Sequence, residues 1–315
     1  MWPTQVQSRM RIAVGIPTSG RPEILSCAID CIGGQTRAPD RVVVCAARPS
    51  DLAGLTLPTA GSIISAPSRG LTPQRNVILD HCEDVDVIAF FDDDFLPHAG
   101  YLAAIERAFA AHPDVVMITG RVVADGIIGP GLSLESARRI LDRPDIAPAP
   151  IEAALPAPTL VDVYNGYGCN MAVRVSAIAA GPLRFDESLP LYGWLEDVDF
   201  SRRLARRGRI AMCPLALGVH LGTKSARLSG VRLGYSQVAN PLYLARKGTM
   251  ATHRAVRQIL RNVAMNVARS VRPESYIDRR GRLWGNVLGA ADLLTNRLAP
   301  TRVLRLPERA SSIGD

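Results

Sequence analysis

Acidic residues are missing from a long stretch of this sequence. No aspartate or glutamate occurs between Ser201 and Pro273. Residues 1–200 carry 15 arginines and 24 acidic residues, a net charge of −9, whereas residues 201–315 carry 22 basic and 5 acidic residues, a net charge of +17. So basic a segment predicts an anionic partner, either nucleotide phosphates or a phospholipid surface. We expect no nucleic-acid partner, because aromatic residues make up only 5% of the chain and no recognition motif accompanies the charge.

Cysteine pairs and long apolar runs are also lacking. The six cysteines form no Cys-x-x-Cys pair, so they are expected as small core residues in a reducing compartment. No apolar run approaches the roughly 18 residues that a membrane span requires, and the N-terminus shows no apolar signal-peptide segment. These absences predict a cytoplasmic protein, which can still rest on the inner face of a membrane.

Apolar strands alternate with helices in the first 120 residues. Thr72 is expected to cap the second helix, with Pro73 at its first position. The alternation predicts an α/β fold with a mostly parallel central sheet and helices on both faces, which binds ligands at the carboxyl ends of its strands. The expected strands are residues 11–17, 41–46, 61–66, 87–91 and 115–119, and the expected helices are 22–32, one from about 72, 99–111 and 135–141.

Three adjacent carboxylates follow the strand expected at residues 87–91. Asp92, Asp93 and Asp94 can all stay ionised only if a cation or several hydrogen-bond donors lie among them. Mg²⁺ or Mn²⁺ prefers carboxylate oxygens and also bridges to a diphosphate. Asp92 and Asp94 point to the same side of an extended backbone, which leaves Asp93 a different role. The alternative is a solvated acidic turn that caps the helix near residue 99.

Polar and aromatic residues gather again in the second half of the chain. Residues 164–174 either approach a sugar closely or form a glycine-rich turn into an edge strand. Glu196 and Asp197 begin a helix directly after Trp194, and such a carboxylate beside an indole is suited to take a proton from a sugar hydroxyl. His220, close to two glycines, is either structural or the last metal ligand.

Two segments have open interpretations. Residues 124–158, rich in proline, form either a surface excursion or a loop that selects an acceptor. Near the C-terminus, apolar residues from 256 to 271 recur at helical spacing, with arginines at 254, 257, 261 and 269. This helix either packs on the catalytic part with a solvated basic side, or lies against anionic lipid.

Taken in order, these motifs resemble family 2 of the inverting, GT-A-fold glycosyltransferases, of the type that builds exopolysaccharide. The resemblance implies a GT-A catalytic domain over residues 1–225, with a nucleotide-binding half (1–120) and an acceptor half (160–225), followed by a basic, mainly helical extension (226–315). The motifs are Ile-Pro-Thr at 16–18 with Arg-Pro at 21–22, Gly-Leu-Thr-Pro-Gln-Arg-Asn at 70–76, Phe-Asp-Asp-Asp at 91–94, Gly-Cys-Asn-Met-Ala at 168–172, Gly-Trp-Leu-Glu-Asp-Val-Asp-Phe at 193–200, and His220.

The resemblance also implies roles for individual residues. Asp92 would lie near the ribose, and Asp94 with His220 would hold Mn²⁺ or Mg²⁺. Asp197 would be the general base, and Glu196 would orient the acceptor. The other implied residues are Pro17, Thr18, Arg21, Arg75 and Asp93 on the donor side, and Asn170 and Trp194 on the acceptor side.

The second strand departs from the family pattern. Family members usually end it with an aspartate that binds the nucleotide base, whereas this chain has Cys-Ala-Ala-Arg at 45–48. Either Asp51, in the following loop, replaces that aspartate, or the nucleotide is held differently. The base is therefore open, with a UDP-sugar as the first expectation.

The implied reaction moves a sugar from a nucleotide sugar to a hydroxyl of a glycan or a lipid-linked acceptor. A nucleotidyltransferase is an alternative, but residues 18–21 are a poor version of its glycine-rich, lysine-containing signature. A catalytically inactive, membrane-associated binding protein is a second alternative. It would need a lost carboxylate, and Asp92, Asp94 and Asp197 are all present.

Overall fold

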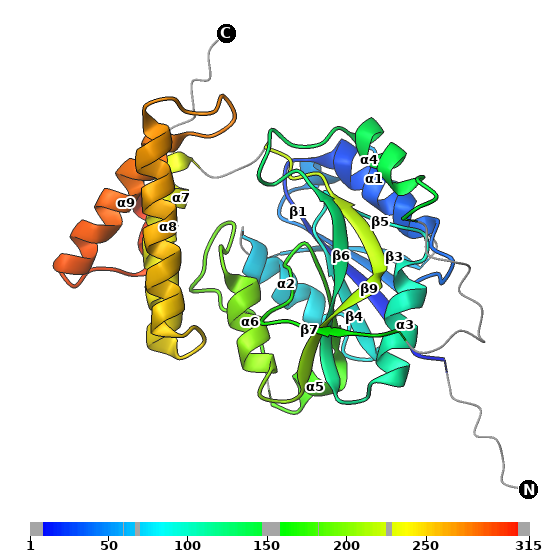
Figure 1. The fold of residues 1–315 in the computed structure, drawn as a ribbon. Helices are drawn as coiled ribbons and strands as arrows, with labels where there is room; N and C mark the ends of the chain where they lie inside the picture. Colours follow the sequence, from blue (N-terminus) through cyan, green and yellow to red (C-terminus); the bar gives the residue numbers. More distant parts are fainter. Residues whose placement is uncertain are drawn as a thin grey trace, which may run out of the picture.

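A nine-stranded sheet forms the centre of the protein, and helices cover both of its faces (Figure 1). The computed structural model describes residues 9–58, 60–66, 70–146, 158–181, 183–224 and 229–307. The strands are β1 (Ile12–Thr18), β2 (Arg41–Ala46), β3 (Gly61–Ser65), β4 (Val87–Phe91), β5 (Phe95–Pro97), β6 (Val115–Asp125), β7 (Val161–Asp162), β8 (Asn170–Arg174) and β9 (Arg209–His220). The helices are α1 (Pro22–Gly33), α2 (Leu71–Asp80), α3 (Tyr101–Ala111), α4 (Leu134–Leu141), α5 (Val175–Ala179), α6 (Glu196–Leu204), α7 (Gly230–Lys247), α8 (Thr252–Ser270) and α9 (Arg279–Leu294), with 3₁₀ turns η1 (Pro49–Leu52) and η2 (Pro300–Arg305).

Most strands of the sheet run in one direction. The strand order is β3-β2-β1-β4-β8-β6-β9-β5, and β7 pairs with β9. The strands β1 to β4 are parallel, and β8 is antiparallel to both β4 and β6, so that β6 and its parallel neighbour β9 again follow the first direction. Only β5, β7 and β8 oppose it within the described residues. This confirms the predicted α/β fold with a mostly parallel sheet.

Alternate residues of the strands supply two separate cores. In β1, Ile12, Val14 and Ile16 pack on the side of α1 and α3, whereas Ala13 packs on the side of α2, α5 and α6. Both sets are fully buried, because successive side chains of a strand point to opposite faces of the sheet. Helices on both faces leave the carboxyl edge of the parallel strands for binding.

The predicted strands and helices of the first 141 residues are present. The strand predicted at 115–119 is longer than expected, because β6 continues to Asp125. Four of the cysteines are buried, as expected of core residues: Cys45, Cys82, Cys169 and Cys213. Residues 147–157 of the proline-rich segment predicted at 124–158 lie outside the described residues.

One local prediction and two of the alternative interpretations are wrong. Thr72 does not cap α2: the cap is Gly70 at φ 141°, and the Thr72 hydroxyl donates to the carbonyl of Leu189 instead. The acidic residues after β4 do not cap α3, which begins at Tyr101 without a side-chain cap. Residues 170–174 are not an edge strand, because β8 lies between β4 and β6.

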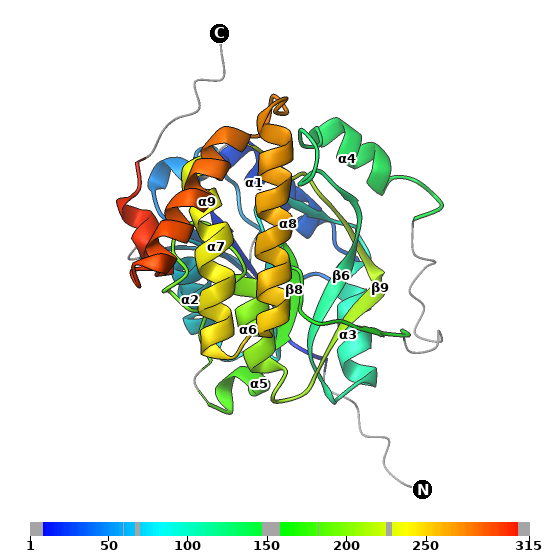
Figure 2. The ribbon, with the colours of Figure 1, turned by 60° about the vertical axis from the view of Figure 1, so that its left-hand side comes forward.

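The helices α7, α8 and α9 form a separate layer beside the sheet (Figure 2). Buried amide groups hold them together: Asn266 of α8 donates to Gln237 of α7 and to Asn286 of α9. Asp199 of α6 anchors this layer by accepting hydrogen bonds from Lys247 and Thr249, both at 2.8 Å. In the part of the chain described, no helix has both the length and the apolarity needed to cross a membrane.

We predict that Asp199→Ala destabilises the folded protein by roughly 3 kcal/mol, because the substitution removes a buried carboxylate from its basic partners. Asp199 has no exposed side-chain area and also accepts from Arg203 at 2.9 Å. Urea denaturation measures the loss. The exposed Asp84, which pairs with Arg41 at 2.6 Å, gives a matched control: Asp84→Ala should leave the stability nearly unchanged. Equal losses in the two variants would contradict the anchoring role.

Candidate active site

Asp92, Asp94 and His220 lie together at the carboxyl edge of the sheet. One ligand atom from each lies within 4.8 Å of the others, and His220 Nε2 is 3.4 Å from Asp94 Oδ1. The strand β5 brings them together, because it leads away from the aspartates and pairs with the end of β9, with Phe95 opposite His220. Two carboxylates and an imidazole can hold a divalent cation, and the carboxylates favour Mg²⁺ or Mn²⁺.

Asp93 serves a different purpose from its two neighbours. Its side chain is buried, accepts a hydrogen bond from the Thr18 hydroxyl at 2.8 Å and pairs with Arg21. Arg21 also donates to Asp94 at 3.0 Å. Burial raises the pKa of Asp93 to about 7, although Arg21 opposes the shift. Thr18 and Arg21 thus fix the loop after β1 against the acidic end of β4.

Arg75 connects the acidic end of β4 with the start of α6. Its guanidinium is fully buried, pairs with Glu196, and donates to Asp92 at 2.9 Å and to the carbonyl of Gly168 at 2.7 Å. Burial raises the pKa of Glu196 to about 8, against the lowering effect of Arg75. Three segments that are distant in the sequence therefore meet at one cation.

Asp197 lies in the first turn of α6, next to an unusual stretch of backbone. Leu191, Gly193 and Leu195 all have positive φ angles, of 61°, 59° and 72°. Left-handed conformations are costly for leucine, and such conformations cluster at functional sites. They turn the chain sharply around Trp194. The carboxylate of Asp197 accepts hydrogen bonds from the backbone N–H groups of Gly168 at 3.1 Å and Val198 at 2.8 Å.

Two residues that the sequence analysis missed support His220. Its Nδ1 lies 2.9 Å from Asp125, and Asp125 also accepts from the Tyr167 hydroxyl at 2.8 Å. Burial lowers the pKa of His220, but the hydrogen bonds to Asp125 and Asp94 outweigh it and raise the pKa to about 10. A carboxylate behind a ligating imidazole fixes the ring for metal binding. Asp125 shares one sequence signal with Asp92, because each follows a run of apolar strand residues.

These groups line two adjoining cavities. The first, of about 400 Å³, contains the cluster of Asp92, Asp94 and His220. The second, of about 330 Å³, contains Asp197. The first cavity is also lined by Arg21 and by Arg261 and Arg282 of the helical layer. The second is also lined by Arg75, Gly168 and Glu196. Both cavities are lined by Asp92, Ile127, Tyr192, Trp194 and His220. Tyr192, Arg261 and Arg282 are further site residues that the sequence analysis missed, although Tyr192 adjoins the Gly-Trp pair that it singled out.

Comparison with known proteins yields similar solved structures. No family model and no curated protein matches the chain. The mannosyltransferase PcManGT from Pyrobaculum calidifontis, in complex with GDP-Man and Mn²⁺, aligns with 95% of this chain and 86% of its own length, at 15% identity and a TM-score of 0.51. TarS 1-349 of S. aureus, in complex with UDP, aligns with 94% of this chain and 91% of its own length, at 12% identity and a TM-score of 0.51. This chain has the GT-A fold.

Some of these structures are longer than this chain. GalNAc-T7 with UDP, GalNAc and Mn²⁺ aligns with 78% of this chain at 11% identity and a TM-score of 0.50, but only 52% of its own length is covered. In a longer TarS structure, the chain covers 40% of the length. Because this chain covers only part of these longer proteins, the similarity to them is one of fold and does not extend to their whole length.

Asp51 lies in the 3₁₀ turn η1, shortly after the end of β2. Its side chain is buried, and Oδ1 accepts from the backbone N–H of Gly20 and from Arg48, both at 2.9 Å. Oδ2 is buried and has no hydrogen-bond partner among the described residues. A buried carboxylate oxygen without a donor is costly, but Asp51 lines neither of the two cavities.

The structure does not bring every expected residue to the GT-A cleft. Asn170 is fully buried, and its side-chain oxygen accepts from the N–H of Gly120 at 2.6 Å and from Thr119 at 3.1 Å. It holds β8 against β6 and lines neither cavity. Pro17 lies within β1, opposite Cys45 of β2, and also lines neither cavity.

We predict that Glu196→Gln gains stability relative to the parent protein as the pH rises from about 4.5 to about 8. Burial raises the pKa of this carboxyl to about 8 from an ordinary 4.5. Between these pH values it ionises in the unfolded chain but stays protonated in the folded protein, so the parent loses stability as the pH rises, whereas glutamine does not ionise. The difference should grow by at most about 1.4 kcal/mol per pH unit. Urea denaturation at several pH values measures it, and a constant difference would refute the raised pKa.

Proposed function

We propose that the protein is a metal-dependent, inverting glycosyltransferase of family 2, which moves a sugar from a nucleotide sugar to a hydroxyl of a glycan or lipid-linked acceptor. One observation carries the proposal: the Asp92, Asp94 and His220 cluster and Asp197 line adjoining cavities at the carboxyl edge of a GT-A sheet. The cavities, of about 400 and 330 Å³, have the size of small-molecule binding sites. Because they adjoin, they could hold the two reacting molecules side by side.

A divalent cation fits the donor site because the carboxylates there outnumber the cations. Asp92, Asp94 and His220 would hold it, and when bound it would stabilise the negative charge of the departing nucleoside diphosphate. The similar structures of PcManGT and GalNAc-T7 contain Mn²⁺. Arg21 is positioned to contribute positive charge, because it lines the same cavity and bonds Asp94.

Asp197 acts as the general base in this proposal. Its carboxylate takes the proton of the acceptor hydroxyl while that oxygen forms a bond to the anomeric carbon. The bond from the anomeric carbon to the diphosphate breaks, and the anomeric configuration inverts. The N–H groups of Gly168 and Val198 orient the carboxylate, and burial raises its pKa, which makes it a stronger base. Glu196 lies beside it, where it would orient the acceptor, and Trp194 would stack on a sugar.

The donor end of the site is suited to a nucleotide base. Asp51 Oδ2, which has no donor among the described residues, would accept a hydrogen bond from the base, as the N–H of a uracil provides. Thr18, Asp93 and Arg75 would support the ribose and diphosphate region through their bonds to the end of β4, and Pro17 would position the loop that follows β1. A UDP-sugar is the first candidate donor.

The C-terminal helices are suited to a role other than catalysis, namely contact with a membrane. We assign the catalytic domain to residues 1–225 and a basic helical extension to residues 226–315, with synthesis of exopolysaccharide as the process. Apolar side chains on the outer side of the extension support contact with the inner face of a membrane. The exposed ones on α8, at its C-terminal end and on α9 include Val256, Leu260, Val267, Val271, Trp284 and Leu294.

We predict that one nucleoside diphosphate raises the melting temperature only when Mn²⁺ or Mg²⁺ is also present. At about 100 times its dissociation constant, such a ligand adds about 2.7 kcal/mol of stability. A thermal-shift panel of UDP, GDP and other nucleoside diphosphates, each with and without metal, identifies the base. Asp94→Asn should abolish the effect of the metal, whereas Asp84→Asn, at an exposed site, should retain it. If no nucleotide stabilises folded protein, the chain is a binding protein for other ligands.

We predict that Asp197→Asn keeps the fold and the nucleotide-dependent stabilisation but slows sugar transfer about 10²- to 10⁴-fold, because asparagine cannot accept the proton. Release of the nucleoside diphosphate from the donor identified above, with acceptor present, measures the rate. Since burial raises the pKa of Asp197, the rate of the parent protein should fall with decreasing pH sooner than for an ordinary aspartate. Nucleotide binding that disappears together with the activity would contradict the role of base.

A further inference from the structure

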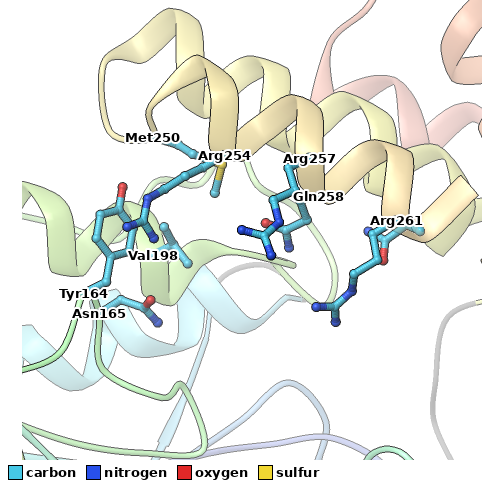
Figure 3. A pocket seen from close by; sticks show the side chains of 9 residues that line it. Tyr164, Asn165, Val198, Met250, Arg254, Arg257, Gln258 and Arg261 are labelled. Atoms are coloured by element: carbon cyan, nitrogen blue, oxygen red, sulfur yellow. The ribbon is translucent and has the colours of Figure 1, made fainter.

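A third cavity, of about 340 Å³, lies between α8 and the segment that carries Tyr164 and Asn165 (Figure 3). It shares Asn165 and Val198 with the cavity of Asp197, and it shares Gln258, Arg261 and Asn262 with the cavity of the metal cluster. One wall comes from the catalytic part of the chain and the other from α8. A group bound here would therefore lie next to both the base and the donor.

The lining of this cavity is positively charged and rich in hydrogen-bond donors. It includes Arg254, Arg257 and Arg261 but no carboxylate. Neither Arg257 nor Arg261 forms an ion pair with any other described residue. The side-chain nitrogen of Asn262 is buried without a hydrogen-bond partner in the described part of the chain. Such a donor set matches an oxygen-rich anion.

One of these arginines is held in position by aromatic contact. The guanidinium of Arg254 lies 4.2 Å from the ring centre of Tyr164, and that of Arg202 lies 4.5 Å from the same ring. A cation over an aromatic face is attracted by the ring and loses part of its rotational freedom. The charge of Arg254 is thereby fixed at the cavity before any ligand arrives.

The basic side of α8 is distinct from its other two sides. Ala255 and Asn266 are buried, and Val256 and Leu260 are exposed. The three arginines at positions 254, 257 and 261 share a further side, because residues three, four and seven apart face the same way on a helix. Their side chains point from α8 toward the cavity (Figure 3). Arg269, on the same helix, does not line it, so the charge is concentrated at the cleft.

We propose that this cavity binds a phosphate group of the acceptor, so that the acceptor is a phosphorylated glycan or a lipid-linked phosphate. The proposal rests on the proposed transferase function, because the cavity adjoins the proposed base. Three arginines suit the two negative charges of a phosphate monoester or a diphosphate, and the planar guanidinium groups match its oxygen geometry. Binding there would hold the acceptor while its hydroxyl reaches Asp197.

Calorimetric titration of the full chain with two phosphate probes tests the site. The soluble probe is glucose 6-phosphate, with glucose as its neutral control. The lipid probe is dodecyl phosphate in nonionic detergent micelles, with the same micelles alone as control. We expect one probe to bind, and we expect Arg257→Gln to weaken it about 10-fold, because a charge-assisted bond is lost. Which probe binds distinguishes a soluble acceptor from a lipid-linked one.

Arg269→Gln is the matched control, because it removes the same charge from the same helix outside the cavity. It should bind the probe as the parent protein does. The proposal is overturned if neither probe binds, or if the two substitutions weaken binding equally, which would indicate general attraction to a basic surface. The titration contains neither nucleotide nor metal, so it tests the phosphate site by itself. If the thermal-shift panel shows no Mn²⁺-dependent nucleotide binding, the transferase function is refuted, but the result of the titration still stands.

Discussion

The buried charge of Arg75 is the constraint on which the rest of the site depends. An arginine without solvent access costs several kcal/mol unless its donors are paired. Its partners come from the end of β4, the carbonyl before β8 and the first residue of α6. The sheet and α6 must therefore be assembled together before this cation is satisfied. Asp197 follows Glu196 directly, so the same ion pair also fixes the position of the proposed base.

The site nevertheless remains short of positive charge. The carboxylates of Asp92, Asp93, Asp94, Asp125, Glu196 and Asp197 gather around Arg21, Arg75 and His220. Burial raises the pKa of several of these acids, which shows that their ionisation is costly without a further cation. A divalent cation would relieve this repulsion. In the proposed function, binding of a divalent cation would recover part of this electrostatic cost.

The sequence predicted local features better than long-range ones. An apolar run followed by Asp92 and Asp94 indicates a strand end, and this signal lies within fewer than ten consecutive residues. Asp125 was missed because Thr119, Gly120 and Arg121 interrupt the apolar run, so the strand was expected to end at residue 119, whereas its irregular pairing with β9 carries it to Asp125. Thr72 and Asn170 were misjudged because their partners, at Leu189 and Gly120, lie far away in the sequence. The side of α8 that faces the cleft also depends on contacts with residues distant in the sequence, so it could not be predicted from the sequence of the helix.

The two halves of the chain meet with opposite charge across the cleft, yet they do not close it. Arg261 lines the same cavity as Asp92 and Asp94 but pairs with neither. The helical layer is held by Lys247 and Thr249 on Asp199, outside the three cavities. This anchor fixes α8 opposite the sheet edge and keeps its arginines available. Lys247 and Arg209 pair the two halves directly outside the cleft, through Asp199 and Asp114. Within the cleft, phosphate groups of the proposed donor and acceptor would each find positive charge, so there the −9 and +17 halves would be complementary through ligands.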